Sequence, residues 1–162
     1  MKKRTVIFSV LTVLWCAVIF LFSAQNADES TDLSDGFIYT ICDAIVPEFD
    51  DYTEAERQQL VSDLAFGVRK TAHFTVYAVL GALVFQAFCL IRKKPLRSVC
   101  SVGFAFLYAC SDEFHQTFVE GRSGQFTDVL IDTSGALLAV LVSLLILHFA
   151  EGRRKKKTEG LT

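Results

Sequence analysis

Acidic and histidine side chains that could bind a ligand or transfer protons are concentrated between residues 108 and 135. Asp112 and His115 are three residues apart, and Asp128 and Asp132 are four apart, so each pair would share one face of a helix. The neighbouring segments 99–110 and 129–149 are largely apolar. Ionisable groups at membrane depth are costly, so their presence here predicts a functional site.

These residue types admit three kinds of chemistry. General acid–base catalysis would use carboxylates with a histidine, and the catalytic candidates are Asp112, Glu113, His115 and Asp132. A divalent metal ion, the one cofactor that the residues could hold, would take oxygen and nitrogen ligands from His73, Asp112 and His115, with Asp128 or Asp132 as a further ligand. Binding of an anion such as a lipid phosphate or a carboxylate is the third. The ligand-binding candidates are Gln25, Arg69, Lys70, His73, Gln116, Arg122 and Asp128.

A purely structural alternative is an ion-pair network that holds short helices together. Charges at membrane depth need partners in any case. Such a network explains why the charges pair. It does not explain why so many charged residues converge, because apolar packing of small residues would join the helices more simply. Gly135 and Ala136 indicate one such close helix contact. The segment Gly121-Arg122-Ser123-Gly124 lacks the pattern of a serine nucleophile elbow.

The elements that must position these residues are four apolar segments in a chain that is 52% hydrophobic. We predict an all-α membrane protein with four transmembrane helices, and residues 1–152 form its membrane domain. A cleaved signal peptide is the alternative for the first segment, but residues 23–27 offer no clean cleavage site. The third segment can cross only if its helix continues through residues 111–116. The expected helices cover about 5–24, 70–91, 97–118 and 127–149.

The outer loop 26–68 is acidic, with Arg57 as its single cation. Its first half predicts an amphipathic helix, because Leu33, Phe37, Ile41 and Ile45 recur every four residues. Pro47 separates it from a second helix. Thr53 and Glu56 have the spacing of a capping box at the start of that helix. Leu60, Leu64 and Val68 would form its apolar face.

Twelve of the sixteen Lys and Arg residues lie in three short segments: 2–4, 92–97 and 153–157. Positive charge marks cytoplasmic segments, so both termini are expected inside a plasma membrane that the chain crosses several times. Residues 153–162 would form a basic cytoplasmic tail, and the polar residues would lie near the outer surface. The basic clusters adjoin spanning segments, so they do not indicate a nucleic-acid surface.

Five blocks of sequence resemble the VanZ-like family of small membrane proteins. They are FSAQ at 22–25, RKTAHFTVYAVLG at 69–81, SDEFHQTF at 111–118, GRSG at 121–124 and DVLIDTSG at 128–135. Glu120 stands where the family often has Pro. The resemblance implies low-level resistance to the lipoglycopeptide teicoplanin, as for the founding member, but it implies no established reaction.

Three functions are therefore weighed. The first is binding or modulation of a cell-envelope lipid, a lipid-linked ligand or a lipoglycopeptide. The second is a membrane-embedded enzyme that acts on an envelope lipid or a cell-wall precursor and could depend on a metal. The third is the structural network. Membrane lipids are the expected partners, and the sequence indicates no oligomeric state.

Overall fold

The computed structural model describes residues 2–159, and the described residues form five α-helices and one 3₁₀ helix. The prediction of an all-α protein is confirmed. The elements are α1 (Lys2–Ser23), α2 (Ala27–Ile45), η1 (Phe49–Asp51), α3 (Glu54–Ala87), α4 (Lys94–Gln116) and α5 (Phe126–Glu159).

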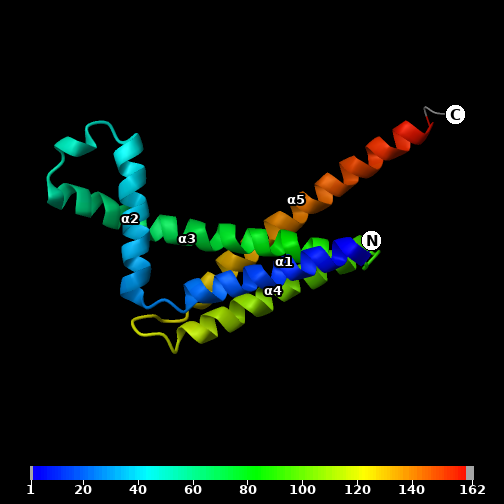
Figure 1. Cartoon of the computed structure of the whole chain (residues 1–162), viewed down its shortest axis with the longest axis horizontal. Coiled ribbons are helices and arrows are strands. Elements are labelled where there is room, and N and C mark those ends of the chain that lie inside the picture. Colours follow the sequence, from blue (N-terminus) through cyan, green and yellow to red (C-terminus); the bar gives the residue numbers. More distant parts are fainter. Residues whose placement is uncertain (1, 160–162) are drawn as a thin grey trace.

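Helices α1, α4 and the second half of α3 run side by side with the start of α5 against them, while α2 crosses near the end of this bundle (Figure 1). The bundle core is formed by Tyr77, Leu80 and Val84 of α3 with small residues of α4 and α5. The indole nitrogen of Trp15 donates to the Val76 carbonyl at 2.9 Å, which fixes α1 on α3.

Helix α3 is continuous from Glu54 to Ala87, so the predicted start of a separate helix near residue 70 is wrong. The capping box at its N-terminus is confirmed: Thr53 accepts from the Glu56 amide, and the Glu56 carboxylate accepts from the Thr53 amide. These 34 residues extend roughly 50 Å. Because a hydrocarbon core is about 30 Å thick, the first part of α3 projects beyond the length that a membrane requires.

A second, smaller core joins α2 to the first part of α3. It contains Ile38, Cys42, Phe49, Val61 and Ala65. Of the expected apolar face of α3, Leu60 and Val68 pack against this core, whereas Leu64 is exposed.

The apolar stripe of α2 does not pack on this core. Leu33, Phe37, Ile41 and Ile45 are all exposed, from 37% to 72%. The predicted periodicity is present, but the stripe is not buried in the protein: Leu33 and Phe37 line a cavity.

Two helical segments of the described chain, Lys3–Ser23 and Phe126–Arg154, are long and apolar enough to span a membrane. Helix α4 continues through residues 111–116 and ends at Gln116. Helix α5 extends to Glu159, well past the expected end near residue 149.

The basic segments 2–4 and 92–97 lie together at one end of the bundle. Arg4 donates to the Gln86 side chain at 2.6 Å, and Arg97 donates to the Phe85 carbonyl at 2.6 Å. Lys94 pairs with Glu151 at 2.6 Å. The starts of α1 and α4 and the end of α3 thus lie level with residue 151 of α5.

Close contact between α3 and α5 depends on two glycines. A Cβ atom on Gly135 would lie 2.1 Å from the Phe74 carbonyl oxygen, and one on Gly81 would lie 2.6 Å from the Ala136 carbonyl oxygen. The expected close approach at Gly135 and Ala136 is confirmed. In both cases the obstacle is backbone, which cannot rotate away.

We expect Gly135→Ala and Gly81→Ala to destabilise the protein by about 1–3 kcal/mol or more, since overpacking forces the helices apart. Gly103→Ala is the control, because a Cβ atom there meets nothing within 4 Å. The control should be neutral or stabilised by up to about 1 kcal/mol through helix propensity. Thermal unfolding in detergent measures all three, and equal effects at Gly103 and Gly135 would refute this role of Gly135.

Candidate functional site

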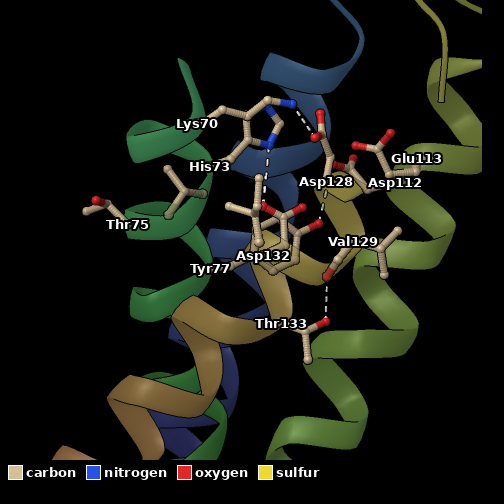
Figure 2. Close-up of polar contacts among 12 residues, drawn as sticks. Lys70, His73, Thr75, Tyr77, Asp112, Glu113, Asp128, Val129, Asp132 and Thr133 are labelled. Carbon is tan, nitrogen blue, oxygen red and sulfur yellow. Dashed lines mark hydrogen bonds and ion pairs between the residues drawn. The ribbon is translucent and has the colours of Figure 1, made fainter. Parts of the chain in front are cut away.

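Polar side chains from α3, α4 and α5 meet inside the bundle (Figure 2). Figure 2 shows carboxylates of α4 and α5 facing Lys70, His73 and Tyr77 of α3. Most of these groups are shielded from solvent: Asp112 and Glu113 are each 5% exposed, and Asp132 is 0% exposed.

Asp112 and Asp132 lie on the same side of the bundle, toward its interior. The Tyr77 hydroxyl donates to Asp112 Oδ2 at 3.3 Å. His73 Nδ1 lies 3.4 Å from Asp132 Oδ1, close enough for an ion pair but long for a hydrogen bond. Because Tyr77 and His73 are one turn apart on α3, one helix face contacts both carboxylates.

An ion pair between Lys70 and Asp128 lies at one side of the cluster. Lys70 donates to Asp128 Oδ1, and both side chains are mostly buried, with 22% and 15% of their surface exposed. As their spacing indicates, Asp128 and Asp132 share a face of α5. Asp128 contacts Lys70 and Asp132 contacts His73, and these two residues lie on the same face of α3.

The turn between α4 and α5 packs tightly against the site. Gly121 has a φ of 73°, which favours glycine, and a Cβ atom on Gly124 would lie 2.4 Å from the Glu113 carbonyl oxygen. The backbone amide of Gln125 donates to Glu113 Oε2 at 2.8 Å. The turn therefore both orients Glu113 and sets the position of Arg122.

Arg122 is half-buried and lines a cavity beside the cluster. Burial lowers the pKa of its guanidinium, while the nearby carboxylates of Asp112 and Glu113 act in the opposite direction. No close ion pair joins Arg122 to either carboxylate in the part of the chain that the structure describes. Its donors can therefore meet a ligand in the cavity.

Several buried polar atoms have no hydrogen-bond partner among the described residues. Both carboxylate oxygens of Asp132 and the Oε1 atom of Glu113 are in this state, as are His115 Nδ1 and Gln116 Nε2. Buried polar groups are normally satisfied, and an unsatisfied one costs about 1–3 kcal/mol, more when charged. Their concentration here is a reason to expect a ligand.

The cavity beside the cluster has a volume of about 740 Å³. Helix α2 and the first part of α3 form one side of it, and the ends of α1 and α4 and the following turn form the other. Its lining includes these predicted site residues: Gln25, Arg69, Lys70, His73, Asp112, Gln116, Arg122 and Asp128.

The structure does not bring every candidate to the same point. The His115 ring packs on Phe20 of α1, with ring centroids 4.6 Å apart, and it does not line the cavity. Within the described chain, the donor atoms that come together are those of His73, Glu113 and Asp132, all within 4.8 Å of one another. This set shares His73 and Asp132 with the metal ligands considered from the sequence, but Glu113 takes the place of Asp112 and His115.

Two site residues were not among the candidates. Tyr77 donates a hydrogen bond to Asp112, and Ser23, at the end of α1, is buried and lines the cavity. The spacing of Tyr77, four residues after His73, was the available signal. Both residues belong to sequence blocks that carry the family resemblance.

Residues 8–147 match the family model described as VanZ/LLP1. The chain belongs to the VanZ/LLP1 family. The match spans α1 to α5 and includes every residue of the polar cluster. Together with the two apolar helices, it indicates a membrane protein. No curated protein and no solved structure matches this VanZ/LLP1 chain.

The Lys70–Asp128 pair should stabilise this VanZ/LLP1 protein more than an exposed pair does. We expect a double-mutant cycle of Lys70→Gln and Asp128→Asn to give a coupling free energy of about 1.5–3 kcal/mol, as for other hydrogen bonds to charged groups. The control cycle uses Lys94 and Glu151, which are 41% and 54% exposed. Its coupling should be about 0–1 kcal/mol. Unfolding in detergent supplies the free energies, and similar coupling in both cycles would contradict a shielded site.

Proposed function

We propose that this VanZ/LLP1 protein crosses the membrane four times and binds the anionic headgroup of a cell-envelope lipid or lipid-linked ligand in its cavity. The observation that carries the proposal is the composition of the cavity wall. Three cations, Arg69, Lys70 and Arg122, lie on it together with large apolar side chains. An amphiphile with a negative headgroup matches both parts of such a wall.

The apolar part of the wall suits a hydrocarbon chain. Phe22, Leu33, Phe37 and Phe66 line the cavity and are between 56% and 72% exposed. They come from α1, α2 and α3, so the apolar surface surrounds the cavity from several sides. A volume of about 740 Å³ falls within the range of about 300–1,000 Å³ that is usual for ligand pockets.

The three cations differ in whether an acidic side chain already pairs with them. Lys70 is paired with Asp128, whereas Arg69 is exposed and Arg122 has no close acidic partner among the described residues. Arginine holds a phosphate or carboxylate with two parallel hydrogen bonds. We assign the main headgroup contacts to Arg69 and Arg122, with Lys70 as a weaker contributor.

The four spans are α1, the second half of α3, α4 and most of α5. α3 and α4 carry the polar cluster, which lowers their hydropathy, but they lie alongside the two apolar helices (Figure 1). The basic end of the bundle is cytoplasmic by the positive-inside rule. The cavity and the exposed apolar stripe of α2 then lie at the outer leaflet, where the stripe contacts lipid.

A pair of single-cysteine additions tests this orientation. In intact cells, a membrane-impermeant thiol reagent should label Asp43→Cys and leave Gly152→Cys unlabelled until the cells are opened. Both positions are exposed, and the unmodified chain serves as the blank, since its Cys42 is only 1% exposed. Labelling of Gly152→Cys alone in intact cells would invert the topology and move the cavity to the cytoplasmic side.

Lipid retention tests the headgroup contacts. The purified protein should keep one anionic phospholipid through native mass spectrometry. The double variant Arg69→Gln/Arg122→Gln should retain at least about tenfold less, since each charged hydrogen bond is worth about 1.5–3 kcal/mol. Arg153→Gln, at an exposed position on the end of α5, is the charge-matched control and should behave as the parent. Equal retention by parent and double variant refutes the proposed contacts.

Low-level protection against teicoplanin is the physiological consequence that we propose for this site. Cells that produce the parent or Arg153→Gln should survive better than cells with the double variant, at equal protein abundance. If the parent gives no protection, the resistance proposal fails for this chain, while lipid retention still decides the binding proposal.

A membrane-embedded enzyme is the second candidate, and the unsatisfied carboxylates favour it. Glu113 and Asp132 lie beside His73, an arrangement that can transfer protons. The site has no buried serine or cysteine nucleophile of known geometry among the cluster residues, so water would be the nucleophile. Release of phosphate or a headgroup from the retained lipid, lost in Glu113→Gln, would favour catalysis over binding alone.

A further inference from the structure

We infer that His73, Glu113 and Asp132 form a binding site for one divalent transition-metal ion. They come from α3, α4 and α5, and a donor atom of each lies within 4.8 Å of the others. Three helices that are distant in sequence therefore converge on one point through a nitrogen and two carboxylate ligands.

The second observation is that these carboxylates lack partners. Asp132 is 0% exposed, and neither of its oxygens has a hydrogen-bond partner in the described part of the chain. Glu113 is 5% exposed, and its Oε1 atom is also unpartnered, while Oε2 is occupied by the Gln125 amide. Desolvated carboxylate oxygens that point to a shared position are the usual surroundings of a cation.

The balance between carboxylates and basic side chains in the cluster also favours a bound cation. The cluster contains four carboxylates, those of Asp112, Glu113, Asp128 and Asp132. Lys70 neutralises Asp128 directly, and Arg122 acts on Asp112 and Glu113 from the cavity side. Asp132 is left with His73 alone, at 3.4 Å. A divalent cation would supply the missing positive charge.

The types of ligand atom limit which metal ions the site can bind. Imidazole nitrogen with carboxylate oxygen suits ions such as Zn²⁺ and Mn²⁺, whereas Mg²⁺ and Ca²⁺ prefer oxygen alone. Zinc bonds of about 2.0–2.2 Å place ligand atoms roughly 3–3.5 Å apart. His73 Nδ1 and Asp132 Oδ1, 3.4 Å apart, already have this separation, and the Glu113 donor atom lies within 4.8 Å of the donor atoms of both residues.

Three protein ligands leave a coordination position for water or a ligand. His73 also lines the cavity, so the ion would lie next to the proposed headgroup position. The metal ligands are not the cations that hold the headgroup, so metal binding and lipid retention can be lost separately, in different variants.

Metal titration of the purified protein tests the inference. The protein should carry no histidine tag, should be stripped with a chelator, and should then be titrated with Zn²⁺, Mn²⁺ and Co²⁺. We expect one ion per chain. His73→Gln, Glu113→Gln and Asp132→Asn should each weaken binding by roughly tenfold or more. His148→Gln and Asp51→Asn, both at exposed positions, are the matched controls and should bind as the parent.

The Co²⁺ spectrum separates this site from the five cysteines of the chain. Nitrogen and oxygen ligands give visible absorption bands without the strong near-ultraviolet band of a cobalt–thiolate bond. Circular dichroism and size-exclusion chromatography identify variants that do not fold, and any one folded variant of the three is sufficient. Binding with a thiolate band, unchanged affinity in a folded variant, or no stoichiometric binding by the parent would each overturn the inference.

Discussion

A carboxylate without any exposed surface imposes the strongest constraint on this molecule. Asp132 is fully buried between helices, where an uncompensated charge costs several kcal/mol. Among the described residues, His73 on the neighbouring helix is its only close basic partner, while a Glu113 carboxylate oxygen also lies within 4.8 Å. The other interactions of the cluster surround this pair: Lys70 holds Asp128 on one side, and Tyr77 holds Asp112 on the other. The site is thus built around an incompletely compensated charge.

Close helix packing makes that arrangement possible. The absence of a side chain at Gly81 and Gly135 lets α3 and α5 meet along their backbones, so short side chains such as Asp132 can reach the next helix. The continuity of α3 has a second effect. One helix carries His73 and Lys70 at the cluster and Phe66 and Arg69 on the cavity wall, so α3 links the polar site to part of the apolar wall.

Local chemistry explains which features the sequence could predict. The capping box at Thr53, the close approach at Gly135 and the shared face of Asp128 and Asp132 depend on neighbours within one helix. The continuity of α3 could not be predicted, because the polar residues near 69 suggested a boundary although no proline interrupts the helix. The choice between Asp112 and Glu113 as the partner of His73 depends on the rotation of α4, and that rotation is set by packing against α1, α3 and α5.

The most direct test of a lipid-binding site is an experimental structure of the protein purified with its native lipids. It should show a negatively charged headgroup between Arg69, Lys70 and Arg122, with a hydrocarbon chain along Phe22, Phe37 and Phe66. Asp128 should remain paired with Lys70 within the bundle. A cavity that is closed by direct contact of Arg122 with Asp112, or that contains only water while lipid binds elsewhere, would contradict it.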